Sequence, residues 1–473
     1  MQERGMAIGL SPDDEQQLDR IAGAAANPGV KDLRKLLWCS IDNDDSLDLD
    51  QLTVFQPLKD GVTRLLVAVA DVDALVPRAT SLDHHAWQNT VTLYTPPRIY
   101  WMLPERLTTN LTSLNANVDR LALIVQVDVD ESGGLVGSDV YRGMVRNHAK
   151  LAYNPVAQWL EERVPPPHEV AAVRGMEEQL VKQDQVAQSL RERRIEHGAL
   201  EFDSLEARPV LRGGQVVDLR LSQRNRAKEL IEDFMIAANG TTARYLRDHG
   251  WPSLRRVVRT PKRWDRMVQI AAEHQFQLPA TPDSKALSEF LKQEKARDPL
   301  RFPDLSLTMI KLMGPGEYAV ERPNEASTGH FGLAVKDYSH STAPNRRYPD
   351  LITHRLLKAL MAGQTCPYSM EELEALAEHC TTRENDAQKV ERRVQKSANA
   401  LLVSKSIGMR FDALVTGVNP DGVWVRVLHP PVEGKLVGTG EHRRVDVGDR
   451  VRVKLVHVSV ERGFIDFAVT GSE

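Results

Sequence analysis

The residues with the clearest chemical potential are five aspartates that fall within nine positions, from Asp42 to Asp50. No lysine or arginine separates them, so their charges repel one another unless cations lie between them. Carboxylate oxygens are the ligands that hard divalent cations prefer, and Mg²⁺ or Mn²⁺ held in this way suits chemistry on phosphate groups. Asp48 and Asp50 alternate with Leu47 and Leu49, so in an extended stretch both carboxylates would face the same side. The segment therefore predicts a divalent metal site.

Two other interpretations of this acidic segment are a calcium-binding loop and a solvated surface loop. An EF-hand loop needs Gly at its sixth position and Glu at its twelfth. Counted from Asp42 those positions are Leu47 and Thr53, and a start at Asp44 fits no better. The EF-hand is excluded, whereas the solvated loop stays open, although it gives no reason for the alternation of leucine and aspartate.

The overall composition is typical of a globular protein. The 473 residues contain 61 Lys and Arg against 65 Asp and Glu, which gives a net charge of -4, and 41% of them are hydrophobic. These values exclude disordered, collagen-like and disulfide-scaffold classes. They also exclude a protein that holds nucleic acid through its overall positive charge, but they leave room for a local basic channel.

Cysteine use and the absence of targeting patterns indicate the compartment. The three cysteines, Cys39, Cys366 and Cys380, form no CxxC pair, so neither a disulfide framework nor a thiolate zinc site is indicated. The first residues lack the basic and then apolar pattern of a signal peptide, and no apolar run is long enough to span a bilayer. We expect a cytoplasmic protein with no membrane partner.

Local patterns predict the elements that must position the acidic segment. Ser11 followed by Pro12 predicts a short helix, and a second short helix is expected after residues 27–29. From about 41 to 130, short β-rich runs alternate with proline-containing turns and predict strands. Helical periodicity then predominates and should cover a sheet, in the stretches 170–194, 225–247 and 370–404. Beyond about 407, short β-rich runs separated by turn residues predict a small barrel.

Four ordered blocks give the chain a resemblance to a known family. The first is Ser40-Ile41-Asp42 with the acidic segment, and the others are residues 102–107, residues 230–239 and the stretch from His330 to Arg355. In order and spacing these blocks resemble the ribonuclease II and ribonuclease R family, whose catalytic domain is called RNB. The resemblance runs from about residue 38 to the C-terminus. It implies a processive 3′ to 5′ exoribonuclease that releases 5′-nucleoside monophosphates.

The resemblance also implies a fold and a domain order. The fold class is an α/β (α+β) RNB domain with a C-terminal all-β OB-fold barrel of the S1 type and a short helical N-terminal region. The expected limits are 1–37 for the helical region, 38–406 for the RNB domain and 407–473 for the OB-fold. Relatives usually carry two cold-shock OB-folds before the RNB domain, and we expect the helical region in their place.

The resemblance assigns roles to individual residues. It implies that Asp42, Asp48 and Asp50 hold the metal, with Gln51 at the position of a fourth aspartate, and that Arg346 contacts the scissile phosphate. These aspartates and the arginine are the expected catalytic residues, of which we expect Asp50 to be the most critical. The resemblance also implies six residues in RNA binding. Tyr94 and Phe202 are the base-stacking aromatics, Tyr153 and Glu232 are linked to end-product size and ribose selection, and Arg347 and Glu391 are further contacts.

Two rival hypotheses remain beside the nuclease. Gln51 and Asn345 depart from the family pattern, so the chain could be an RNA-binding relative with weak or no nuclease activity. The second rival hypothesis is a scaffold subunit that recruits other nucleases. For the nuclease, we expect RNA with a single-stranded 3′ end as the partner, leave a duplex with an overhang open, and expect a monomer with no obligate protein partner.

Overall fold

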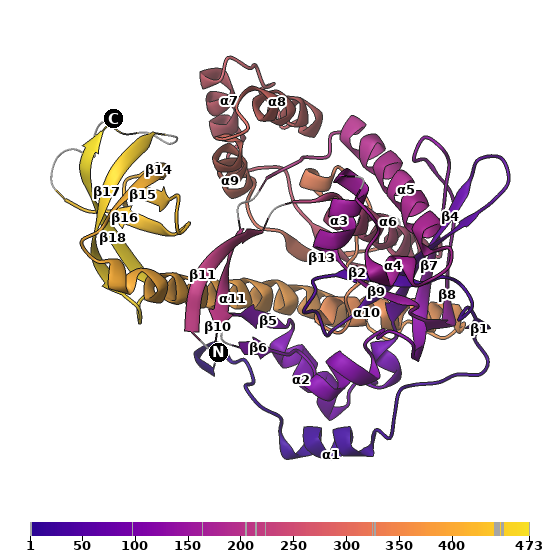
Figure 1. Cartoon of the computed structure of the whole chain (residues 1–473). Coiled ribbons are helices and arrows are strands. Elements are labelled where there is room, and N and C mark those ends of the chain that lie inside the picture. The colour runs from indigo at the N-terminus through magenta and orange to yellow at the C-terminus, as the bar shows by residue number, and fades with distance from the viewer. Residues whose placement is uncertain are drawn as a thin grey trace.

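The computed structural model describes residues 2–96, 98–162, 164–203, 206–212, 215–222, 224–323, 325, 328–438, 445 and 449–472. Its centre is a seven-stranded sheet in the order β1-β8-β7-β4-β3-β2-β9 (Figure 1). The strands of this sheet are β1 (Lys31–Asp32), β2 (Cys39–Asp42), β3 (Gln51–Pro57), β4 (Thr63–Ala70), β7 (Asp119–Val129), β8 (Leu135–Arg146) and β9 (Ala149–Ala152). Neighbours from β2 through β8 pair antiparallel, whereas β1 and β9 join in parallel.

Helices cover both faces of the sheet. The α-helices are α1 (Pro12–Arg20), α2 (Ser81–Asn89), α3 (Tyr153–Glu162), α4 (His168–Ala171), α5 (Met176–Glu196), α6 (Arg226–Asp248), α7 (Trp264–Glu273), α8 (Ser284–Arg297), α9 (Phe302–Met313), α10 (Tyr348–Met361) and α11 (Met370–Val403). Strand β4 shows how the faces divide, because successive side chains of a strand point to opposite sides. Leu65 and Val67 pack with α3, α5 and α6, while Leu66 and Ala68 pack with α2, α10 and α11. Both faces of the sheet are therefore buried at its central strand.

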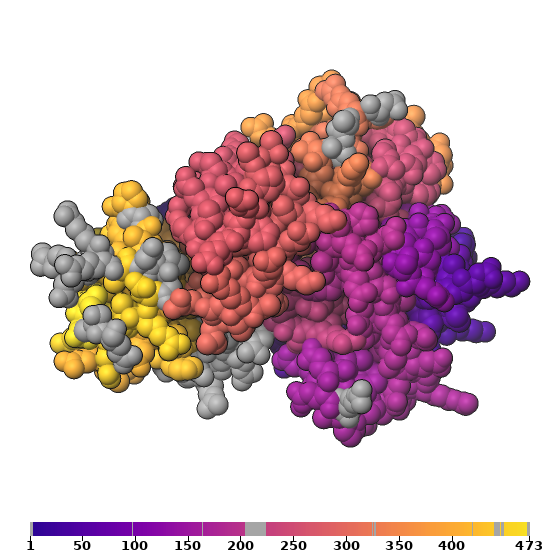
Figure 2. All heavy atoms as spheres, turned by 90° about the horizontal axis from the view of Figure 1, so that it is seen from above, coloured from indigo at the N-terminus to yellow at the C-terminus, as the bar shows by residue number. Residues whose placement is uncertain are grey.

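Two short hairpins, a two-stranded sheet and a helical unit surround this centre. The hairpins are β5 (Leu93–Thr95) with β6 (Arg98–Tyr100) and β10 (Glu206–Arg212) with β11 (Gln215–Ser222). Strand β12 (Ser253–Val257) pairs antiparallel with β13 (Glu317–Glu321), and α7, α8 and α9 lie between them in the sequence. Helices α7, α8 and α9 have a hydrophobic core of their own. Figure 2 shows this helical unit, in red, lying against the C-terminal barrel, in yellow.

The C-terminal strands form a closed barrel in the order β14-β15-β16-β18-β17. Its strands are β14 (Arg410–Asn419), β15 (Gly422–Val427), β16 (Glu433–Leu436), β17 (Arg450–Ser459) and β18 (Phe464–Ser472). Alternating residues of these strands fill its interior, and Ala400 and Val403 from the end of α11 pack into the same core. The barrel thus sits directly on the last turn of the long helix (Figure 1).

The structure confirms the predicted fold class. It also confirms the N-cap of α1, where Ser11 and Asp14 form a capping box, and the three predicted helical stretches. The second short helix expected after residues 27–29 is wrong. The Asn27 side chain accepts a hydrogen bond from the Gly29 N–H and turns the chain, and residues 31–32 then pair with the edge of the sheet as β1. The domain limits at 37 and 406 stay a prediction.

None of the helices in the described ranges is both long enough and apolar enough to cross a membrane.

Candidate functional site

The acidic segment is the connection between β2, which ends at Asp42, and β3, which begins at Gln51. Asp44 and Asp45 point to solvent, so the solvated-loop interpretation holds for those two alone. Asp48 and Asp50 are only 6% and 2% exposed. Burial of carboxylates is costly unless they are paired, so these two need partners.

One hydroxyl brings two of the predicted metal ligands together. Ser46 Oγ lies 3.2 Å from Asp42 Oδ2 and 3.3 Å from Asp48 Oδ1. Burial raises the pKa of Asp42, and the charge of Asp48 acts in the same direction. Ser46 was not among the predicted site residues, although its place between the aspartates could have suggested such a bridge.

Asp50 is held by two residues that lie far from it in the sequence, Asn345 and Arg346. The Asn345 N–H donates to its Oδ1 at 2.9 Å, and Arg346 Nε donates to its Oδ2 at 3.1 Å. Burial raises the pKa of Asp50 to about 7, because Asp48 adds to the effect of burial and Arg346 only partly opposes it. The side chain of Arg346 is 43% exposed, so it extends from the buried carboxylate toward solvent.

Tyr94 and Glu391 complete this group. The Tyr94 hydroxyl donates to Asp48 Oδ2, and the Tyr94 N–H donates to Glu391 Oε1 at 3.1 Å. Tyr94 is nevertheless 44% exposed. Its ring packs edge-on against the ring of Trp101, with 6.3 Å between the two ring centroids. Its hydroxyl is fixed while much of its surface stays accessible. We call Tyr94 and Glu391 together the clamp.

The backbone of residues 90–94 connects the clamp to the arginine. Thr92 N–H donates to the carbonyl of Arg346 at 3.0 Å, and the carbonyl of Thr90 accepts from Tyr348 N–H at 2.8 Å. Thr90 is buried and has a φ of 63°, which is an unfavourable conformation for a β-branched residue. Strain of this kind persists only where surrounding contacts enforce it, and here it fixes the start of the segment that carries Tyr94.

Phe202 and Glu232 form a second group. Arg224 joins them, because its Nη1 donates to the carbonyl of Phe202 and its Nη2 to Glu232 Oε2, both at 3.3 Å. The Phe202 side chain packs against the core of α7, α8 and α9. Nothing in the sequence pattern pointed to Arg224.

The last predicted residues lie at the ends of elements. Arg347 precedes α10 and pairs with Asp350 at 2.8 Å, an ion pair within one turn of chain. Tyr153 begins α3 directly after β9 and is partly buried in the core on that face. Gln51 begins β3 and pairs with Val69 of β4. Their roles in RNA or metal binding stay predictions.

The residues of the acidic segment fit a divalent cation in chemistry, while other groups hold their oxygens in this structure. In the described part of the chain, no three His, Cys, Asp or Glu side chains are arranged as a metal-binding cluster. Tyr94 and Arg346 instead contact Asp48 and Asp50. The donors are hard carboxylate oxygens. Burial raises the pKa of Asp42 and Asp50, and a bound cation would lower both again, because it stabilises the charged carboxylates.

Two known protein domains match most of the chain. Residues 30–363 match the RNB domain, and residues 409–470 match the RNase II-type exonuclease C-terminal S1 domain. Ribonuclease R of Escherichia coli (strain K12) is 30% identical over 95% of this chain and 58% of its own length. Ribonuclease R 1 of Lactococcus lactis is 28% identical over 94% of this chain and 57% of its own length. The chain thus spans less than two thirds of these curated relatives.

Solved structures agree with this placement. Mycoplasma genitalium RNase R in complex with ribose-methylated single-stranded RNA has a TM-score of 0.88 and 21% identity, over 99% of this chain and 76% of the other. The same protein in complex with double-stranded RNA has a TM-score of 0.87 and 22% identity, over 99% and 82% of the chains. At this identity the likeness shows the fold, and the family rests on the RNB match over most of the sequence. The chain belongs to the ribonuclease II and ribonuclease R family.

Proposed function

We propose that this protein is a processive 3′ to 5′ exoribonuclease that hydrolyses RNA to 5′-nucleoside monophosphates. The observation that carries the proposal is the convergence of buried Asp48 and Asp50 with Arg346 and the half-exposed Tyr94. Buried acids, an arginine that reaches solvent and an accessible aromatic ring are the parts that phosphodiester hydrolysis at a chain end requires. Family membership supports the same reaction.

RNA binding falls to aromatic side chains and to the barrel. The accessible ring of Tyr94 stacks on a terminal base, and Phe202 supplies the second aromatic surface. Stacking of a base on an aromatic ring is worth about 1 to 3 kcal/mol and tolerates every base, as an enzyme that removes nucleotides in turn requires. The complexes of the Mycoplasma relative with single-stranded and double-stranded RNA support RNA as the partner.

Arg346 stabilises charge on the phosphate. Its Nε is engaged by Asp50, which orients the guanidinium plane and leaves the terminal nitrogens to donate to phosphate oxygens. The Asn345 N–H donates to the other oxygen of the same carboxylate, which fixes the carboxylate and therefore the position of the arginine. Donors aimed in advance at developing charge are usually the largest contribution to such a reaction.

Asp42, Asp48 and Asp50, with the amide oxygen of Gln51, would hold Mg²⁺ or Mn²⁺. A bound divalent cation supplies Lewis-acid stabilisation of charge on the phosphate. The Tyr94 hydroxyl would then give up its contact with Asp48, whereas Arg346 keeps its contact with Asp50. An RNA-binding relative without activity remains the second outcome of the test, although no contact of Gln51 in the structure favours it.

The compartment and the assembly state are part of the proposal. The three cysteines are free, and Cys39 and Cys380 are buried. Burial raises the pKa of both thiols, so neither is reactive, and a reducing cytoplasm suits them. We propose a monomer in that compartment.

The test is the release of nucleotides from a single-stranded oligoribonucleotide labelled at its 5′ end, in Mg²⁺, in Mn²⁺ and in EDTA. With divalent metal, the wild type should release 5′-nucleoside monophosphates and convert the labelled RNA directly to a short end product, without a ladder of intermediate lengths. Asp50→Asn should lower the rate at least about a thousandfold and keep RNA affinity. Asp44→Asn changes an exposed aspartate of the same segment and should cleave normally. RNA binding by the wild type without release in any buffer would refute the nuclease and favour the binding protein.

A further inference from the structure

The N-terminal segment, residues 2–20, lies against the elements that carry the clamp. Met6 is 2% exposed, and it packs with Leu93 of β5 and Ala387 of α11 in a small hydrophobic core separate from the main ones. Three partly buried side chains complete this core: Val91, Tyr100 and Val390. A methionine fills an irregular gap between a strand and a helix well, because its side chain is long and unbranched.

The Met6 core lies directly beside the clamp. Leu93 is the residue before Tyr94, and Val390 is the residue before Glu391. Neighbouring side chains of a strand point to opposite faces, so Leu93 points toward Met6 while Tyr94 points toward the aspartates. The Tyr94 N–H and Glu391 Oε1 are 3.1 Å apart across the same strand and helix. Met6 therefore fills the space that sets the distance between the two halves of the clamp.

Polar contacts on both sides of Met6 fasten the segment. The Ala7 N–H donates to Asn89 Oδ1 at 2.9 Å, and Gln88 Nε2 donates to the carbonyl of Gly5 at 3.1 Å. Arg4 pairs with Asp386 of α11 at 2.5 Å. The residues that flank Met6 are thus tied to α2 on one side and to α11 on the other.

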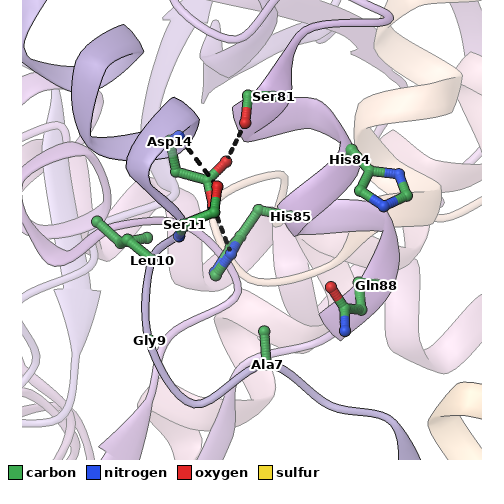
Figure 3. Close-up of a pocket in the computed structure, with 9 residues that line it drawn as sticks. All are labelled: Ala7, Gly9, Leu10, Ser11, Asp14, Ser81, His84, His85 and Gln88. Atoms are coloured by element: carbon green, nitrogen blue, oxygen red, sulfur yellow. Dashed lines mark hydrogen bonds and ion pairs between the residues drawn. The ribbon is translucent and has the colours of Figure 1, made fainter.

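A second anchor lies farther along the segment, at a pocket of about 280 Å³ (Figure 3). Asp14 accepts from Ser11 N–H at 2.8 Å and from the Ser81 hydroxyl, and it lies 3.4 Å from His85 Nδ1. Ser81 donates to Asp14 and not to His85, which differs from a nucleophilic triad. The charged groups of this pocket contact one another, so the pocket fastens α1 to α2.

The same contacts define the tautomer of His85. Because Asn89 Oδ1 accepts from Ala7, its Nδ2 faces His85 Nε2 at 3.2 Å. Nε2 is then the acceptor, and the ring proton lies on Nδ1 toward Asp14. Residues 7, 14, 85 and 89 therefore form one connected network, and the two anchors of the segment act together.

We propose that the N-terminal segment positions the clamp and that Met6 is the positioning residue. This inference rests on the proposed function, since the clamp has a role only if RNA is bound. By filling the space between β5 and α11, Met6 holds Tyr94 and Glu391 at their working separation before RNA arrives. A clamp ordered in advance binds more tightly, because binding then does not have to order it.

The test compares Met6→Ala and the milder Met6→Val with Met6→Leu, which restores an apolar side chain of similar size. Ile8→Ala is the matched control, because Ile8 is 43% exposed on the same segment. With a single-stranded oligoribonucleotide, we expect Met6→Ala to raise KM about tenfold and to change kcat less than threefold. Met6→Val should be intermediate, and Met6→Leu and Ile8→Ala should be close to wild type.

A second measurement is made without RNA. Hydrogen exchange of the β5 amides should become at least about tenfold faster in Met6→Ala, while exchange in β4 stays unchanged. If the protein does not cleave RNA at all, this exchange result still tests the positioning role. Unchanged exchange in β5, an equal increase throughout the sheet, or a loss in kcat with KM unchanged would overturn the inference.

Discussion

The hydroxyl and the ring of Tyr94 have separate tasks, and two substitutions distinguish them. Tyr94→Phe removes the oxygen that donates to Asp48 and keeps the ring, whereas Tyr94→Ala removes both. We expect the two variants to change different binding constants. Tyr94→Ala should weaken RNA binding, and Tyr94→Phe should strengthen the binding of a divalent cation, because Asp48 no longer has to give up a hydrogen bond.

The magnitudes follow from the contacts. Loss of a base stack costs about 1 to 3 kcal/mol, which corresponds to a drop in RNA affinity of about 5-fold to 150-fold. A hydrogen bond to a charged group contributes about 1.5 to 3 kcal/mol. Tyr94 is 44% exposed, so water replaces part of the lost contact, and we expect the lower end, a gain in cation affinity of about tenfold.

The RNA dissociation constant is measured by fluorescence anisotropy in EDTA, and the Mn²⁺ dissociation constant by calorimetric titration without RNA. Tyr100→Phe serves as the control, because Tyr100 lies on the partner strand of the same hairpin and packs in the Met6 core. An equal loss of RNA affinity in Tyr94→Phe and Tyr94→Ala would refute the role of the ring. Unchanged Mn²⁺ affinity in Tyr94→Phe would refute the role of the hydroxyl.

Two further predictions concern stability. Arg426 of β15 pairs at 3.1 Å with Asp304, whose side chain is 3% exposed, so Arg426→Ala strands a buried charge and should cost about 3 to 5 kcal/mol in urea unfolding. The additional change Asp304→Asn should restore part of this loss, and a cost below about 1 kcal/mol contradicts the prediction. His330 Nδ1 accepts from Leu333 N–H at 3.2 Å, and burial lowers the pKa of His330 from 6.5 to about 4. Its folded-state pKa lies below the unfolded value, so its stabilisation is complete above pH 6.5 and is lost toward pH 4, by about 3 kcal/mol. Urea unfolding at pH 7.5 and pH 4 should show a smaller loss for His330→Asn, and an equal loss in both proteins contradicts the reasoning.

Local signals in the sequence were enough to predict the first helix, the three longest helices and the barrel. Ser11 and Asn225 mark helix starts with their side chains, and hydrophobic periodicity marks the helices that follow. The second short helix failed because the backbone of residues 31–32 finds partners on β8, which lies far away in the sequence. An isolated turn signal does not reveal a free sheet edge.

The aspartates of the site were predictable by type and spacing, but their partners were not. Tyr94 reaches Asp48 across 46 positions of sequence, and Arg346 reaches Asp50 across 296. Such pairs exist only after the sheet, β5 and the segment before α10 have been brought together. The family resemblance supplied Tyr94 and Arg346 as site residues, but it did not predict these contacts. The strained Thr90 and the buried Met6 lacked any local signal, because both depend on tertiary packing.

The way the barrel is attached has a mechanical consequence. Ala400 and Val403 belong to the barrel core, while Glu391 of the same helix belongs to the clamp. One continuous helix therefore joins the barrel to the clamp. The part of α11 between Glu391 and Val403 is about 18 Å long, and a tilt of about 5° at one end shifts the other by about 1.6 Å. That shift is enough to break a hydrogen bond. Under the proposed function, a pull on RNA bound to the barrel would therefore be transmitted along α11 to Glu391, with no flexible linker in between.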